Sequence, residues 1–164
     1  MATGTGWFRR MEVWLSTSAV RHAVEGDLEQ LLELYRHLHH REEPPALDSH
    51  LQELWSEMLA DHNMHILVIE KDDHLLASCT LVVVRNLTRA AHPYALIENV
   101  VTHANYRREG YGKRVIDKAL KIAWHRDCYK VMLMTGNESV VEFYEKCGFK
   151  IGEKTGLVAY PNGL

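Results

Sequence analysis

The spacing of apolar residues changes from one period to another within residues 94–134, and this change constrains the fold more than any other feature. Tyr94–Val101 is a dense apolar run typical of a buried strand, whereas the apolar residues of 110–125 recur at helical spacing. The run Tyr129–Met134 then predicts another strand. A strand, a helix and a strand in this order require a crossover, so we expect the two strands to pair in parallel.

Before this unit, two strands follow one another without a helix between them. The runs His65–Glu70 and Leu75–Val84 flank the polar turn 71–74, which predicts an antiparallel hairpin. A short first strand is expected within Ala19–Val24. The sheet should therefore be mixed, with most of its strand pairs antiparallel.

Two amphipathic helices separate the first strand from the hairpin. One begins near Asp27 and the other near Ser49, and each start is followed three residues later by Gln, as in a capping box. A later short helix ends at Gly148, and Phe149–Ile151 and Leu157–Tyr160 are expected as closing strands. The pattern predicts an α/β (α+β mixed) fold, with a central mixed, mostly antiparallel sheet flanked by helices.

Composition indicates one ordinary globular domain. The 164 residues are 46% hydrophobic and 25% charged, a length that suits a single domain. We expect residues 1–11 to form a flexible leader and residues 12–164 to form the domain. The net charge of -3 argues against a nucleic-acid or anionic-membrane partner. No stretch approaches the roughly 18 apolar residues of a membrane span.

The cysteines and histidines give no metal motif. Cys79, Cys128 and Cys147 have spacings that fit neither a zinc site nor a CxxC motif, and a reduced, cytoplasmic setting is the simplest interpretation. His37 and His40 are spaced as neighbours on a helix and could hold a metal. A solvated helix end is the favoured interpretation, and no metal is expected.

The connection that follows the strand at 94–101 has the composition of an anion site. Arg107, Arg108 and Lys113 supply positive charge around Gly110 and Gly112. Glycines let a backbone approach a ligand closely and adopt positive φ, and the first N–H groups of a helix are unpaired. A phosphate or pyrophosphate site and a plain strand-to-helix turn both fit this pattern. The spacing is neither that of a P-loop nor a complete GxGxxG.

Two polar side chains lie within apolar segments. Glu98 shares a strand face with Leu96 and Val100, where it is either paired for structure or desolvated in a way that suits a general base. Tyr144 lies on the apolar side of the last helix. There it is either core, with Phe143 beside it, or a hydroxyl that must find a partner.

Two motifs in order resemble the GNAT superfamily of N-acetyltransferases. Arg107-x-x-Gly110-x-Gly112 after a strand is similar to its acetyl-CoA pyrophosphate loop. Asn137-x(5)-Phe143-Tyr144-x(3)-Gly148-Phe149 is similar to its C-terminal helix. Other segments resemble the glucosamine-phosphate N-acetyltransferase-like branch most nearly: Ile97-Glu98-x-Val100-Val101, Tyr106-Arg107, Gly112-Lys113, Cys128-Tyr129-Lys130 and Phe143-Tyr144-x-Lys146-x-Gly148.

The resemblance implies an acetyl-CoA-dependent N-acetyltransferase that acts on a primary amine of a small molecule by direct attack in a ternary complex. Glu98 is then expected as the base, directly or through water, and Tyr144 as the acid for the departing thiolate. The strand edge at Val100 and Val101 would pair with the pantetheine arm and polarise the thioester carbonyl. The expected cofactor-binding residues are Val100, Val101, Arg107, Arg108, Glu109, Gly110, Tyr111, Gly112, Lys113 and Asn137.

The substrate-facing positions depart from that branch. It usually has Asp at the position of Asn99, and its Leu-Glu-Cys segment becomes Leu133-Met134-Thr135-Gly136 here. Its tail carries arginines, whereas Thr155–Leu164 contains no basic residue. The acceptor therefore stays open among amino sugars, polyamines, amino acids, drugs and protein amines.

Further expectations follow from the resemblance. Tyr35, His39 and Trp55 are expected near the acceptor, because the first helices often line that pocket in the family. A homodimer is expected because members are often dimers. A ping-pong route through Cys128 or Cys147 is disfavoured. The alternatives are a non-catalytic CoA-binding regulatory module and a metal-binding protein that uses the histidines.

Overall fold

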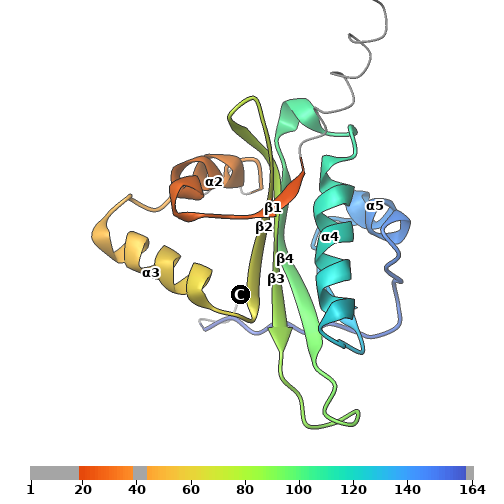
Figure 1. Cartoon of the computed structure of the whole chain (residues 1–164). Coiled ribbons are helices and arrows are strands. Elements are labelled where there is room, and N and C mark those ends of the chain that lie inside the picture. The colour runs from red at the N-terminus through yellow and green to blue at the C-terminus, as the bar shows by residue number, and fades with distance from the viewer. Residues whose placement is uncertain (1–18, 39–43, 162–164) are drawn as a thin grey trace, which may run out of the picture.

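The computed structural model describes residues 19–38 and 44–161. Five strands form one sheet, which Figure 1 shows nearly edge-on between two groups of helices. The predicted leader, residues 1–11, lies outside the described residues. In spatial order the strands are β1 (Val20–His22), β2 (Met64–Lys71), β3 (His74–Val84), β4 (Tyr94–Thr102) and β5 (Val131–Met132).

The strand pairing confirms the predicted mixed sheet. Neighbours from β1 to β4 are antiparallel, whereas β4 and β5 are parallel. The β2–β3 hairpin turns at Asp72 and Asp73, whose φ angles are 51° and 61°, a region that Asp enters more readily than most residues. The parallel pair is joined through α4 (Tyr111–His125), as the change of apolar period predicted.

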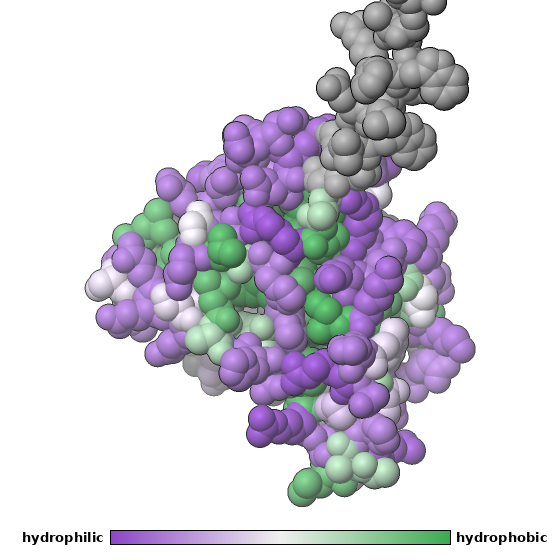
Figure 2. Space-filling view, in the orientation of Figure 1, coloured by the Kyte–Doolittle hydropathy of each residue, from purple (hydrophilic) through white to green (hydrophobic). Residues whose placement is uncertain are grey.

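Helices cover both faces of the sheet (Figure 1). α2 (Leu28–Tyr35) and α3 (Ser49–Ala60) lie on one face, and α4 and α5 (Val141–Lys146) lie on the other. In the same orientation, Figure 2 shows a largely hydrophilic surface with an apolar tip at its lower end. That tip belongs to the β3–β4 connection, where Leu87 is 95% exposed. Short 3-10 segments occur at Glu25–Asp27, Ala104–Tyr106 and Glu138–Val140.

The sheet separates two hydrophobic cores. On one face, Leu67 and Ile97 pack with Ile116 of α4. On the other, Leu34 of α2 and Trp55 of α3 are buried with side chains of β2 and β3. Successive side chains of a strand point to opposite faces, so the same strands supply both cores. Most apolar side chains of the helices face a core, as the helical spacing predicted, but Leu54 of α3 is 43% exposed.

Both predicted capping boxes are wrong in detail. The Asp27 carboxylate does not cap α2; it accepts from the N–H of Val24 at 2.8 Å and pairs with Arg21 at 2.6 Å. The cap of α3 is Asp48, one residue earlier than expected, which accepts from the N–H of Leu51 at 2.9 Å. A nearby guanidinium is a stronger partner for a carboxylate than a backbone N–H.

The chain forms less sheet after β4 than the sequence predicts. β5 covers two residues of the expected run 129–134, and within the described residues no strand forms at 149–151 or 157–160. Apolar spacing alone does not make a strand, because its backbone groups also need a neighbour to bond. No helix of residues 19–38 and 44–161 is long and apolar enough to cross a membrane.

Candidate active site

An extra residue reshapes β4 near its centre. Ser78 pairs with Val101 and Thr80 pairs with Glu98, so three steps along β4 match two steps along β3. Asn99 takes up the extra residue with a φ of 52°, which Asn tolerates better than most side chains. A bulge of this kind bends the strand and increases its twist.

The bulge also changes which face each side chain of β4 meets. Ile97 and Val100 both pack against the core on the α4 side, whereas Val101 joins the core on the α2 side. Regular alternation would place Ile97 and Val100 on opposite faces. The prediction that Val100 shares a face with Glu98 is therefore wrong, because the inserted residue shifts the alternation.

One edge of β4 is open beyond this point. β5 pairs only with Ala95 and Leu96, so among the described residues no strand accompanies residues 98–102 on that side. Unpaired backbone groups of a strand edge can bind an extended ligand as an added strand. The edge includes Val100 and Val101, for which the sequence predicted contact with the pantetheine arm.

The loop before α4 has the backbone geometry of an anion site. Gly110 is the N-cap of the helix with a φ of 86°, and among the residues that the structure describes no side chain caps the first turn. Arg108, with a φ of 67°, and Glu109 are exposed beside it. The first N–H groups of this 15-residue helix are therefore available to an anion. Cofactor contact by Arg108, Glu109, Gly110 and Tyr111 stays a prediction that this geometry favours.

Gly112 has a different role from Gly110. It is buried in the first turn of α4, where a β-carbon would come 2.9 Å from Oγ1 of Thr102 and 3.3 Å from Cζ of Phe143. The missing side chain lets α4 approach β4 and α5 closely. Gly112 therefore serves contacts within the protein, and cofactor contact by its backbone N–H stays a prediction.

Two of the three loop cations have partners within the protein. Lys113 donates from Nζ to both carboxylate oxygens of Asp117 at 2.8 Å. Arg107 donates from Nε to the carbonyl of Thr102 at 3.3 Å and from Nη2 to the carbonyl of His37 at 3.1 Å. Phosphate contacts of Arg107 and Lys113 stay predictions.

Glu98 is exposed, so the desolvation expected from its apolar neighbours is wrong. Asn99 beside it is exposed as well, so the apolar run of β4 is interrupted at the bulge. Glu98 of β4 is the cross-strand partner of Thr80 of β3. Within residues 19–38 and 44–161 it forms no salt bridge, so a structural ion pair does not explain the carboxylate.

Tyr144 is half-buried in α5 and close enough to Glu98 to sense its charge. Its ring centroid lies 5.1 Å from that of Phe143 and 6.3 Å from that of Phe149, so the ring packs as the core alternative expected. Burial raises the pKa of Tyr144, and the nearby Cys147 and Glu98 raise it further. The phenol therefore keeps its proton at neutral pH, as a proton donor must.

Asn137 precedes α5 and shapes the turn into it. Its Oδ1 accepts from the N–H of Ser139 at 3.0 Å and from the Ser139 hydroxyl at 2.7 Å. Gly148 ends the helix with a φ of 95°, as predicted, and donates to the carbonyl of Glu145 at 2.9 Å. Asn137 is exposed, and its contact with the cofactor stays a prediction.

The three thiols are buried, and none forms a disulfide. Burial raises the pKa of Cys79 to about 12 and also raises the pKa of Cys128 and Cys147. A thiol attacks as its thiolate, so these raised values disfavour a covalent acetyl-cysteine route.

Comparison with known proteins decides the family. A model of the acetyltransferase (GNAT) family matches residues 28–149. The chain belongs to this family. The predicted fold and the prediction of an acetyl-transferring enzyme are confirmed. GNAT acetyltransferases use acetyl-CoA as their cosubstrate.

Individual GNAT proteins agree with this assignment. The chain is 32% identical over 136 residues to a glucosamine 6-phosphate N-acetyltransferase of Trypanosoma brucei brucei, covering 79% of this chain and 87% of that protein. A putative acetyltransferase from Agrobacterium tumefaciens is 42% identical with a TM-score of 0.81, covering 87% and 99% of the two chains. Glucosamine-6-phosphate N-acetyltransferase from Arabidopsis thaliana shares the fold, with a TM-score of 0.80, 23% identity and coverage of 88% and 99%.

The GNAT sheet carries a buried polar group that sequence reasoning missed. Oγ of Ser78 and Oγ1 of Thr80 are buried and have no hydrogen-bond partner within the described residues. Tyr35 of α2 lies close to them: burial raises its pKa, and the nearby side chains of Thr80, Ser78 and Asn99 oppose that rise. The signal was the pair Ser78-x-Thr80 inside an apolar strand.

The three residues predicted to contact the acceptor have different outcomes in the structure. Trp55 is 3% exposed and donates from Nε1 to the carbonyl of Glu25 at 3.1 Å, so it belongs to the core and the prediction of a substrate contact is wrong. His39 and His40 lie outside the described residues. A role of Tyr35 toward the acceptor stays a prediction, favoured by its place beside Asn99.

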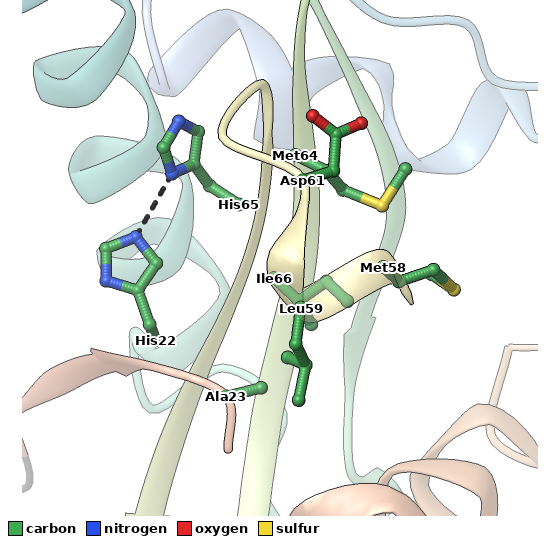
Figure 3. Close-up of a pocket in the computed structure, with 8 residues that line it drawn as sticks. All are labelled: His22, Ala23, Met58, Leu59, Asp61, Met64, His65 and Ile66. Carbon is green, nitrogen blue, oxygen red and sulfur yellow. Dashed lines mark hydrogen bonds between the residues drawn. The ribbon is translucent and has the colours of Figure 1, made fainter. Parts of the chain in front are cut away.

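A cavity of about 160 Å³ lies between α3 and β2, away from the GNAT site residues. Figure 3 shows His22 and His65 pointing toward each other beside it, with Nε2 of His22 3.2 Å from Nδ1 of His65. None of its lining residues was predicted for the cofactor or the chemistry. In the part of the chain that the structure describes, no three His, Cys, Asp or Glu residues gather as a metal site.

Proposed function

We propose that the chain transfers the acetyl group of acetyl-CoA to a primary amine of a small molecule by direct attack in a ternary complex. One observation carries the proposal: three features adjoin along β4. The open edge at Val100 and Val101 suits an extended arm. Thr102, next along the strand, touches the uncapped start of α4 at Gly112. Glu98, on the other side of the bulge, lies near Tyr144.

The backbone holds most of the cosubstrate in this proposal. N–H groups of Arg108–Lys113 bind the pyrophosphate, because an uncapped helix start favours anions. The edge at Val100 and Val101 pairs with the pantetheine arm and polarises the thioester carbonyl. Asn137 contacts the same arm. Acetyl-CoA supplies the thioester, and the protein supplies position.

Glu98 and Tyr144 move the protons. A primary ammonium has a pKa of about 10 and does not attack while charged, so Glu98 takes its proton directly or through water. The amine nitrogen then bonds to the acetyl carbon, the carbon–sulfur bond breaks, and the nitrogen releases its second proton to water. Tyr144 gives its hydroxyl proton to the departing sulfur, a role that its raised pKa supports.

An amino sugar is the first acceptor to test. The relatives from Trypanosoma brucei brucei and Schizosaccharomyces pombe carry the name glucosamine 6-phosphate N-acetyltransferase, which supports this class. A phosphate ester is usually bound by cationic side chains, and residues 155–164 contain none. Glucosamine and glucosamine 6-phosphate therefore need to be compared directly.

We also propose a cytoplasmic homodimer. The segment after α5 exposes large apolar side chains and forms no strand in the described residues, so a second copy would cover apolar surface there. The three reduced thiols suit a cytoplasmic setting. The exposed fractions in this segment are 70% for Ile151, 91% for Leu157, 61% for Val158 and 59% for Tyr160.

The test is acetyl-CoA-dependent thiol release across a panel of small amines, with the full chain and with Tyr144→Phe and Glu98→Gln. The proposal predicts a saturable acceptor whose turnover falls in both variants. Acetyl-CoA binding without turnover on any amine would contradict the proposed acceptor class. Failure of acetyl-CoA to bind would contradict the role of the loop before α4.

A further inference from the structure

Arg107 joins the end of β4 to the turn after α2, which lies 70 residues before it in the sequence. Its guanidinium donates to the carbonyl of His37, just beyond α2, and to the carbonyl of Thr102, at the end of β4. We call these two hydrogen bonds the Arg107 bridge. Arg107 directly precedes the loop that should bind pyrophosphate, so the bridge links that loop to α2.

The bridge fits the chemistry of both its ends. The carbonyl oxygens of His37 and Thr102 each accept a hydrogen bond from the Arg107 guanidinium, and a charged donor makes a stronger hydrogen bond than a neutral one. Beside it, the rings of His37 and His103 lie with centroids 4.2 Å apart. The turn after α2 is thus held against the end of β4 by a charged hydrogen bond and a ring contact.

The same end of α2 also reaches the reacting part of β4. α2 packs against β3 and β4, and Tyr35, two residues before His37, is close enough to Ser78, Thr80 and Asn99 for them to influence its pKa. Thr80 is the cross-strand partner of Glu98. The end of α2 is therefore the side of the site that an amine acceptor approaching Glu98 would meet.

We propose that Arg107 is a positioning residue that couples the cofactor loop to the acceptor-facing end of α2, rather than a ligand of the pyrophosphate. Ordering the loop around acetyl-CoA then orders the turn after α2 through the Arg107 bridge. By linkage, acetyl-CoA and the acceptor each strengthen the binding of the other. This inference rests on the proposed function, because it takes the loop as the cofactor site.

Hydrogen exchange of the full chain with and without CoA tests the coupling without an acceptor. CoA should slow amide exchange at residues 108–113 and, through the bridge, at residues 35–38, by about fivefold or more in each segment. In Arg107→Met, protection of 108–113 should persist while that of 35–38 is lost. Arg107→Lys keeps the charge but not the two-carbonyl geometry, and it should behave like Arg107→Met.

Arg108→Met is the matched control, because it removes the same charge from the next position without touching the bridge. At saturating CoA it should keep protection of 35–38. In turnover, Arg107→Met should raise the acceptor KM about fivefold or more and change the acetyl-CoA KM less than about twofold. An equal rise of the acceptor KM and the acetyl-CoA KM in Arg107→Met would overturn the coupling. Protection of residues 35–38 that survives in Arg107→Met would overturn it as well. CoA that fails to protect even 108–113 would overturn the proposed function as well.

Discussion

Gly112 and Phe143 are in such close contact that a β-carbon at residue 112 would lie 3.3 Å from Cζ of the ring, and 2.9 Å from Oγ1 of Thr102. α4, β4 and α5 meet at this point, so the helix start that should bind pyrophosphate is placed by the packing of one small residue. The second glycine of the motif is therefore needed for packing between elements.

Gly112→Ala should destabilise the protein and weaken acetyl-CoA binding together. The added methyl group has no room unless Thr102, Phe143 or α4 shifts, and overpacking of this kind costs about 1–3 kcal/mol. Gly26→Ala is the control, because a β-carbon there meets nothing within 4 Å. Thermal unfolding and acetyl-CoA titration check both variants. An unchanged melting temperature and an unchanged acetyl-CoA Kd in Gly112→Ala would contradict the packing role.

Tyr144→Phe should reduce kcat by about 100-fold with little effect on acetyl-CoA binding. Removing a general acid typically costs at least this factor, while the ring and its contacts with Phe143 and Phe149 remain. The pKa of Tyr144 is raised by burial, so the alkaline loss of kcat in the wild type should begin above the usual tyrosine range. A pH–rate profile measures this, and an unchanged kcat in the variant would remove Tyr144 from the chemistry.

Glu98→Gln should lower the pKa of Tyr144. The negative charge of Glu98 disfavours a phenolate nearby and so raises the pKa of Tyr144; an amide of the same shape lacks that effect. Carbon-13 NMR of labelled tyrosine follows the titration, and Tyr144→Phe identifies its signal. A tyrosine that titrates identically in both proteins would show that the two groups do not interact.

Arg21→Met should cost about 2–3 kcal/mol of unfolding free energy at neutral pH. Arg21 pairs with Asp27, which is 5% exposed, and with Glu70. The pKa of Asp27 is lowered, first by its bond to Arg21, so this stabilisation is present above the usual carboxyl pKa and is lost as pH falls through the lowered one. The variant should therefore unfold at higher pH on acidification.

Arg36→Met is the control for that measurement. Arg36 forms an exposed pair with Glu33 at 3.5 Å, and such pairs contribute about 0.5 kcal/mol or less. Urea unfolding measures the free energy of unfolding of both variants. An equal decrease in the two variants would mean that removing any arginine destabilises the protein this much, and that the pair of Arg21 with Asp27 contributes nothing specific.

Patterns that repeat along the chain predicted the fold well. The change of apolar period after Tyr94–Val101 predicted the crossover and the parallel strand pair. Two apolar runs joined by a polar turn were enough to predict the hairpin. The prediction of closing strands at 149–151 and 157–160 was wrong, because a strand depends on a neighbouring strand that local sequence does not reveal. The predicted cap of α2 was wrong because the Asp27 carboxylate pairs with Arg21, a residue of β1 that no helix pattern includes.

The site was predictable where a backbone conformation demands a residue type. Gly110 and its left-handed φ are an example. The bulge at Asn99 was not predictable, because it appears only when β4 is paired with β3. For the same reason the exposure of Glu98, the face of Val100 and the contact of Arg107 with His37 required the folded chain.

The central claim is direct acetyl transfer from acetyl-CoA to an amine, and two-substrate initial-rate kinetics test it most directly. Thiol release should be measured while acetyl-CoA and glucosamine 6-phosphate, or the best amine of the panel, are varied together. Direct transfer in a ternary complex predicts saturation by both substrates, with reciprocal plots that intersect. Parallel plots with an acetylated cysteine, or no amine-dependent thiol release at all, would contradict it.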